Sequence, residues 1–192
     1  MEKLSGKKKI AVLISGRGSN LKSLIKYSKK KNAKFKIILV ISNNAYAKGL
    51  GIAKKFKIKN LYISHKNKKK FESQSLKLLE KYKTDLICLA GFMKILSNNF
   101  INKYSKPILN IHPSLLPKYK GLNAHKRAIE NKEKYSGATV HIVNKKLDSG
   151  KIIFQKKIRI LKTDDNKSLE KKILKIEHKV YPKAIIKFLT NY

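Results

Sequence analysis

Short apolar runs separated by segments of helical periodicity restrict the fold of this chain most strongly. Residues Ile10 to Ile14 form one uninterrupted apolar run, and Leu86 to Ala90 form another. Such runs are typical of strands buried on both faces of a parallel sheet. After the first run, Leu21, Leu24 and Ile25 recur on one helix face. This alternation predicts an α/β fold with a doubly wound, mostly parallel, Rossmann-like sheet and helices on both faces.

The same patterns predict the other elements. Strands are expected at residues 35–41, 60–63, 107–111, 138–143 and 152–160, and helices at 48–56, 71–82 and 124–130. Near the C-terminus, one stripe of a long helix comprises Leu169, Ile173, Ile176, Val180 and Phe188. Because proline lacks a backbone N–H, we expect Pro182 to kink or interrupt this helix.

Length and composition suit a single folded domain over residues 1–192, since 42% of the residues are hydrophobic. The single cysteine, Cys88, lies within an apolar run and is interpreted as a buried strand thiol. The apolar blocks are of strand length, too short for a membrane span or a signal peptide. We therefore expect a cytoplasmic protein that does not associate with membranes.

The net charge of +36 has two interpretations, a nucleic-acid-binding protein or a solvated lysine-rich surface. Only three of the 47 basic residues are arginine, and the lysines are spread along the whole chain. Because specific recognition of phosphates and bases relies on the arginine fork, we favour the second interpretation. Weak attraction to polyanions is expected, but no specific nucleic-acid partner.

The phosphate turn, as we call Ser15 to Asn20, follows the first predicted strand and contains Gly16 and Gly18. Backbone N–H groups that converge at a helix N-terminus form a site for a phosphate. The turn matches neither the dinucleotide fingerprint nor the nucleotide-triphosphate loop, and so suits one phosphate of a small molecule. The alternative is a tight turn in which Ser19 or Asn20 caps the helix.

Asn110 and His112 lie two residues apart at the end of a predicted strand and can therefore face one site. An amide can donate to a developing oxyanion, and a histidine can exchange a proton near neutral pH. The alternative is a structural polar cluster. The sequence has no nucleophile elbow and no second histidine at metal-ligand spacing nearby, which favours direct group transfer without a metal or a covalent enzyme intermediate.

Asp148 lies in a predicted turn between two strands. A carboxylate beside His112 would raise the pKa of that histidine and fix its orientation. The alternative is an ordinary Asp-Ser-Gly turn, which the residues alone favour. His141, within a strand, is a candidate to line the same site. The other three histidines are expected at the surface or behind the site: His65, His125 and His178.

Four stretches of the chain together resemble the phosphoribosylglycinamide formyltransferases, a family of folate-dependent formyltransferases of purine synthesis. They cover residues 11–21, 89–97, 109–118 and 137–150, and the similarity runs from about Ile10 to Pro182. Related formyltransferases share the motif Asn-x-His-Pro-Ser-Leu-Leu-Pro, which begins here at Asn110. The phosphate turn and the compact length point to this member of the group.

The resemblance implies that the formyl group of 10-formyltetrahydrofolate passes to the amine of glycinamide ribonucleotide by direct attack, in de novo purine biosynthesis. It implies a catalytic trio of Asn110, His112 and Asp148. Asn110 and His112 would stabilise the tetrahedral oxyanion, and Asp148 would keep His112 charged. The co-substrate is then 10-formyltetrahydrofolate, and no metal is expected. The expected partners are small molecules, and the expected oligomeric state is a monomer or a homodimer.

The resemblance also implies binding residues, with the ribonucleotide phosphate site in the N-terminal half and the folate site in the C-terminal half. The ribonucleotide residues would be Gly18, Ser19, Asn20 and Glu177. The folate residues would be Lys68, Met93, Lys94, Ile95, Leu96, Asn144, Lys145, Lys146 and Leu147.

At four positions the chain departs from the family pattern. Lys68 stands where the family usually has arginine, which keeps the charge but loses the fork that binds a carboxylate. Lys120 and Lys151 stand where proline is common, and Thr139 replaces a frequent serine. We expect the first change to weaken binding of the folate tail.

Three other functions are alternatives to the ribonucleotide formyltransferase. Formyltetrahydrofolate hydrolase uses the same trio on water but normally carries an N-terminal regulatory domain, and few residues precede Ile10. Methionyl-tRNA formyltransferase normally has a C-terminal RNA-binding domain, which does not fit after Tyr181. A catalytically silent polyanion-binding protein is suggested by the charge, but the trio and the phosphate turn argue against it.

Overall fold

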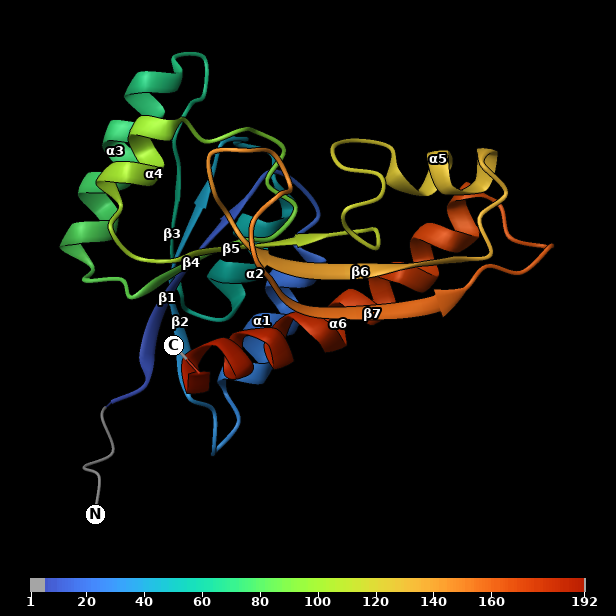
Figure 1. Cartoon of the computed structure of the whole chain (residues 1–192). Helices are drawn as coiled ribbons and strands as arrows, with labels where there is room; N and C mark the ends of the chain where they lie inside the picture. Colours follow the sequence, from blue (N-terminus) through green and yellow to red (C-terminus); the bar gives the residue numbers. More distant parts are fainter. Residues whose placement is uncertain (1–5, 192) are drawn as a thin grey trace. The chain divides into compact units, whose positions relative to one another are not determined.

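The computed structural model describes residues 6–191. The chain divides into two compact units, of which the first ends at Pro107 and the second begins at Ile108. Figure 1 shows strands and helices alternating along the first unit and a long C-terminal helix in the second. Each unit contains one group of the predicted site residues, so the two are described in turn.

The first unit is built on four parallel strands in the order β3-β2-β1-β4. The strands are β1 (Lys8–Ile14), β2 (Phe35–Ser42), β3 (Lys59–Tyr62) and β4 (Leu86–Leu89), and the helices are α1 (Ser19–Ser28), α2 (Lys48–Lys55), α3 (Lys68–Lys81) and α4 (Asn98–Lys103). Strand β1 lies inside the sheet, and its residues 10–14 are fully buried. The uninterrupted apolar run therefore forms an interior strand of this unit, paired on both sides.

The second unit joins three antiparallel strands to a long helix. Its elements are β5 (Ile108–His112), α5 (Ala124–Glu130), β6 (Tyr135–Ile142), β7 (Ile152–Arg159) and α6 (Asn166–Asn191). Helix α6 packs along β6 and β7, as Figure 1 shows in red and orange. A small apolar core, made by Ala128, Ala138, Leu169 and Ile173, holds α5 and α6 against β6.

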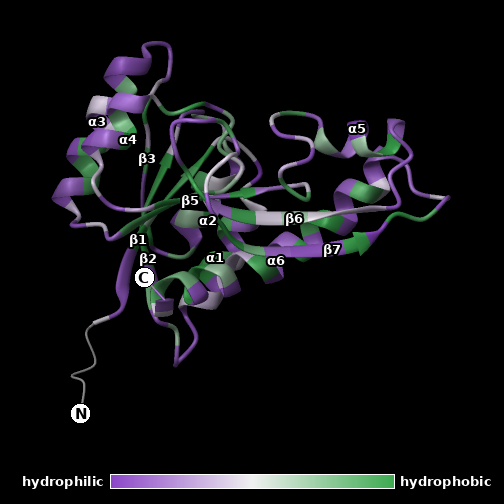
Figure 2. Ribbon diagram, viewed as in Figure 1, coloured by the Kyte–Doolittle hydropathy of each residue, from purple (hydrophilic) through white to green (hydrophobic). Residues whose placement is uncertain are grey.

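Hydropathy follows the elements in both units. Figure 2 shows green, hydrophobic stretches on the strands of the first unit, and green and purple faces on the helices. Strand β7 has an exposed basic end that includes Lys156, Lys157 and Arg159. Charged side chains there oppose pairing of the strand with another chain. In residues 6–191, no helix combines the length and the apolar character needed to cross a membrane.

The predicted α/β fold class is confirmed, and the long elements begin and end within a few residues of their expected positions. Three details differ. The short helix α4 was not predicted, because six residues with one buried side chain show no helical period. Strand β6 begins at Tyr135, before the expected Ala138. Helix α6 is one continuous helix with Pro182 inside it, so the expected interruption is wrong.

Burial explains why α6 continues through its proline. An internal proline costs a helix one hydrogen bond and creates a steric clash. Here Pro182 is itself buried, and Tyr181, Ala184 and Ile185 on either side of it are fully buried. The free energy of burying this apolar stripe offsets the lost hydrogen bond, because each large apolar side chain contributes about 1.5–3 kcal/mol.

The turn between β6 and β7 approaches the end of β6 very closely at Gly150. A Cβ atom at this position would overlap the carbonyl oxygen of Ile142. Only glycine allows the two backbones to come this near. The close approach fixes the turn that carries Asp148 to the end of β6.

We predict that Gly150→Ala lowers the free energy of unfolding by about 2 kcal/mol, because the added methyl group displaces the backbone of the turn. The matched control is Gly51→Ala, at an exposed position of α2 where an added Cβ meets no atom within 4 Å. The control is expected to stabilise the helix by about 0.5–1 kcal/mol. Urea denaturation measures both changes, and equal effects would contradict the close approach at Gly150.

Candidate functional site

Asn110 and His112 lie in β5 and both contact Asp148. The Asn110 amide nitrogen Nδ2 donates to Asp148 Oδ1 at 3.3 Å. The His112 ring nitrogen Nδ1 lies 3.3 Å from Asp148 Oδ2. The expectation that the two β5 side chains face one site is therefore confirmed in their geometry. We call Asn110, His112, His141 and Asp148 the Asp148 cluster.

Asp148 is at the centre of this cluster and is only 9% exposed. Its backbone has a left-handed φ of 44°, which Asp tolerates better than most residues. Besides its contacts with Asn110 and His112, its Oδ2 accepts a hydrogen bond of 2.9 Å from the Gly121 backbone N–H. The ordinary Asp-Ser-Gly turn considered above does not describe a buried carboxylate with these partners.

His141 completes the cluster from β6, where it pairs with Asn110 across the sheet. Its Nε2 lies 3.5 Å from Asp148 Oδ1 and 3.3 Å from the Asn110 amide nitrogen. Its Nδ1 lies 2.9 Å from the carbonyl oxygen of Ile142, and a carbonyl can only accept, so Nδ1 carries a hydrogen. His141 therefore lies beside Asn110 and Asp148, the position expected from its strand.

The other three histidines lie apart from these contacts. His65 rests against the ring of Phe71 in the first unit, with centroids 5.0 Å apart. His125 and His178 are partly buried in the second unit, and burial lowers the pKa of both.

Both ring nitrogens of His112 face hydrogen-bond acceptors. Nε2 lies 2.8 Å from the carbonyl oxygen of Tyr119, so Nε2 carries a hydrogen and donates it. Nδ1 faces the Asp148 carboxylate, which also accepts. A doubly protonated ring satisfies both partners, whereas a neutral ring with its proton on Nε2 keeps only the carbonyl contact.

Burial opposes the charged form of His112. Burial lowers the pKa of His112, and the Tyr119 carbonyl and the Asp148 charge raise it without restoring the ordinary value. Asp148 thus raises the pKa as predicted, but burial is the larger effect and opposes the charged ring that the family resemblance implies. Burial likewise tends to raise the pKa of Asp148, but hydrogen bonds from His141 and Gly121 and the two histidine charges lower it overall.

The loop after Pro117 holds the cluster through backbone groups that the sequence did not reveal. It supplies the Tyr119 carbonyl to His112 and the Gly121 N–H to Asp148. The Tyr119 hydroxyl donates to Glu133 at 2.9 Å, and the guanidinium of Arg127 lies 5.1 Å from the centre of the Tyr119 ring. Backbone contacts leave no residue-type signature, so the sequence singled out neither Tyr119 nor Gly121.

The phosphate turn lies in the first unit at the start of α1. Gly18 is the N-cap residue, with φ 73°, and no side-chain cap hydrogen bond forms in this described turn. A Cβ on Gly18 would lie 2.5 Å from the Cα of Gly49, so the turn packs tightly on α2. The alternative in which Ser19 or Asn20 caps the helix is therefore wrong, since both residues lie inside α1.

The remaining predicted binding residues are divided between the units. In the first unit, Met93, Lys94 and Ile95 are exposed, Leu96 is buried, and the exposed Lys68 begins α3. In the second unit, residues 144–147 are exposed and run directly into Asp148. Glu177 is buried within α6.

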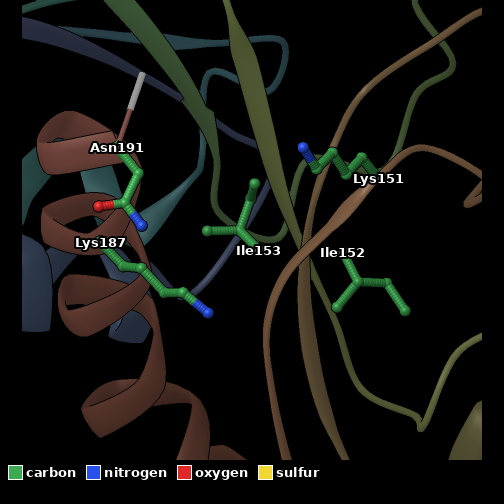
Figure 3. Close-up of a pocket in the computed structure, with 5 residues that line it drawn as sticks. All are labelled: Lys151, Ile152, Ile153, Lys187 and Asn191. Atoms are coloured by element: carbon green, nitrogen blue, oxygen red, sulfur yellow. The ribbon is translucent and has the colours of Figure 1, made fainter.

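A separate hollow of about 390 Å³ opens in the second unit, as Figure 3 shows. It lies at the start of β7 and the end of α6, and its lining residues are Lys151, Ile152, Ile153, Lys187 and Asn191. No member of the Asp148 cluster lines it. Across residues 6–191, no group of three or more His, Cys, Asp or Glu side chains is arranged to hold a metal ion.

Comparison with known proteins identifies the family. The formyl transferase family model matches residues 8–185. The chain belongs to the formyl transferase family. Among solved structures, phosphoribosylglycinamide formyltransferase from Brucella melitensis superimposes with a TM-score of 0.91 at 38% identity, covering 97% of each chain. The two folds therefore agree over nearly the full length of both chains.

Curated relatives differ in length. Phosphoribosylglycinamide formyltransferase from Haemophilus influenzae is 42% identical over 191 residues, which covers 96% of this chain and 88% of that protein. The trifunctional purine biosynthetic protein adenosine-3 of Gallus gallus is 43% identical over 184 residues. The match covers 94% of this chain but only 18% of that longer protein. This formyl transferase domain therefore occurs both alone and within a multifunctional chain.

We predict that the His112 imidazole of this family member titrates below pH 6.5, because burial disfavours its charged form. Removing the neighbouring charge by Asp148→Asn is expected to lower the pKa of His112 further. As the pH falls below 6.5, the histidine of the unfolded chain is protonated before the buried His112. The free energy of unfolding therefore decreases as the pH falls. NMR titration of the ring protons measures the pKa; a value above 6.5 in the wild type would contradict the dominance of burial.

Proposed function

We propose that this chain is a phosphoribosylglycinamide formyltransferase, which transfers the formyl group of 10-formyltetrahydrofolate to the amine of glycinamide ribonucleotide. The observation that carries the proposal is the contact of one buried carboxylate, Asp148, with both Asn110 and His112 in a formyl transferase family domain. Relatives bearing that name, similar over almost the whole chain, support it.

In the proposed reaction, the ribonucleotide amine attacks the formyl carbon directly. A carbon–nitrogen bond to the amine forms, the bond from the formyl carbon to N10 of the folate breaks, and one proton passes from the amine to N10. The products are formylglycinamide ribonucleotide and tetrahydrofolate. The intermediate carries negative charge on the formyl oxygen, and fixed hydrogen-bond donors lower the barrier by stabilising that charge.

Each member of the trio has a role in this proposal. The Asn110 amide, oriented by Asp148, donates to the oxyanion. For His112 to donate to the oxyanion, its Nε2–H turns from the Tyr119 carbonyl to the substrate, and its lowered pKa leaves the neutral ring able to accept a proton in the reaction. Asp148 aligns both side chains and favours the charged ring when a proton arrives. Proton transfers between amine and N10 run through water.

Substrate binding is proposed to follow the family pattern within a single formyltransferase domain. Gly18, Ser19, Asn20 and Glu177 bind the ribonucleotide. Lys68, the segment 93–96 and the segment 144–147 bind the folate. Small molecules are then the partners, 10-formyltetrahydrofolate is the co-substrate, no metal is required, and the site of action is cytoplasmic.

We expect the purified protein to release tetrahydrofolate from 10-formyltetrahydrofolate only when glycinamide ribonucleotide is present, because the amine is the acceptor. Absorbance spectroscopy with and without the ribonucleotide measures the release. Folate turnover at an equal rate without the ribonucleotide would contradict the transferase and indicate hydrolysis by the same trio.

We expect Asn110→Ala to lower kcat by about 10²–10³-fold, the usual cost of losing an oxyanion donor. Asp148→Asn is expected to lower kcat comparably, because it removes the charge that aligns His112. Ribonucleotide affinity, measured by calorimetry, should change little in either variant. The matched control is Asn131→Ala, at the exposed end of α5, which should keep full activity. Normal kcat with lost ribonucleotide binding would refute these roles.

A further inference from the structure

Residues 93–96, here called the 93–96 segment, are held at both ends by polar side chains within the first unit. At the first end, the Met93 backbone N–H donates to the Ser15 hydroxyl at 2.8 Å. Met93 is 64% exposed and Ile95 is 65% exposed, so these apolar side chains gain little from packing. Leu96 is buried, but residues 93–95 depend on the polar anchors for their shape.

Ser15 is itself fixed at the end of β1. Its hydroxyl donates its single hydrogen to Asn43 Oδ1 at 2.6 Å, which leaves the oxygen to accept from Met93. Its backbone N–H donates to the Gly91 carbonyl at 3.1 Å, and its own carbonyl accepts from the Asn44 amide at 3.2 Å. Ser15 thus links the segments that follow the carboxyl ends of β1, β2 and β4.

The second anchor is Glu72, a carboxylate of α3 that is only 6% exposed. Its Oε1 accepts from the Ser97 backbone N–H at 2.7 Å, and its Oε2 accepts from the Ser97 hydroxyl at 2.6 Å. The neighbouring Phe71 stacks on Phe92 with ring centroids 5.8 Å apart. A buried carboxylate is tolerated only when such donors satisfy it, so this contact defines where the segment ends.

We propose that Ser15 and Glu72 are positioning residues that hold the 93–96 segment in the shape that receives the folate. The inference rests on the proposed function, in which this segment binds the co-substrate. A segment held at both ends loses little conformational freedom on binding, so its affinity is higher than that of a loose loop. Neither residue touches a reacting atom.

The two anchors differ in what else they hold. Ser15 is the first residue of the phosphate turn, and the next residue, Gly16, accepts a hydrogen bond from the Gly49 N–H at 3.1 Å. Because Ser15 begins this turn, we expect loss of its hydroxyl to disturb the proposed ribonucleotide site as well as the folate segment. Glu72 hydrogen-bonds Ser97, which follows the segment and is also the N-cap of α4, so we expect its loss to affect the folate segment rather than the phosphate turn.

The test is calorimetric titration of each variant with tetrahydrofolate and, separately, with glycinamide ribonucleotide. Losing a hydrogen bond costs up to about 1.4 kcal/mol, or up to about tenfold in affinity. Ser15→Ala should weaken tetrahydrofolate binding about tenfold and ribonucleotide binding about threefold. Glu72→Ala should weaken only tetrahydrofolate binding. In steady-state kinetics, Glu72→Ala should raise KM for 10-formyltetrahydrofolate and leave kcat within about twofold.

Matched controls on α3 are the exposed Ser73→Ala and Glu80→Ala, which should bind both ligands as the wild type does. Ser15→Thr keeps the hydroxyl and Glu72→Gln keeps an acceptor, so both should restore much of the tetrahydrofolate affinity. Alanine variants that bind tetrahydrofolate as the wild type does would overturn the inference, as would equal loss of both ligands by Glu72→Ala together with a lower Tm. A wild type that binds no tetrahydrofolate would instead refute the proposed function.

Discussion

The buried Asp148 carboxylate is the group on which the arrangement of the Asp148 cluster depends. A carboxylate that is 9% exposed is stable only if donors satisfy it, and here the Gly121 N–H and the Asn110 amide donate to it. Two imidazole nitrogens lie within 3.5 Å of it. The turn that carries Asp148 is in turn fixed by the close approach of Gly150 to β6. Backbone geometry thus places the charge, and the charge orients the two side chains proposed for catalysis.

The electrostatics of this cluster are a balance between burial and charge. Burial lowers the pKa of His112, while Asp148 and the Tyr119 carbonyl raise it. A ring whose pKa is lowered by burial but which lies beside a carboxylate is able to accept a proton during the reaction, which suits a group that must pass one. The loop holding Tyr119 and Gly121 is therefore as important to the cluster as the side chains themselves.

Much of the fold followed from apolar runs and their spacing, because buried strands such as β1 carry no polar residue at positions 10–14. The pairing of Asn110 with His112 followed from strand alternation. Residue chemistry alone did not predict that Asp148 lies beside these two residues, because a single aspartate in a turn shows no periodicity. That prediction came from the family resemblance. The continuity of α6 through Pro182, the short α4 and the backbone contacts of Tyr119 depend on tertiary packing, which local pattern does not encode.

The central claim, direct transfer of a formyl group to an amine, is tested most directly by following the formyl carbon. With ¹³C in the formyl group of 10-formyltetrahydrofolate, NMR of a reaction containing glycinamide ribonucleotide should show the label leaving the folate and entering the new amide of the ribonucleotide. Label that accumulates instead as free formate, at a rate independent of the ribonucleotide, would contradict the claim.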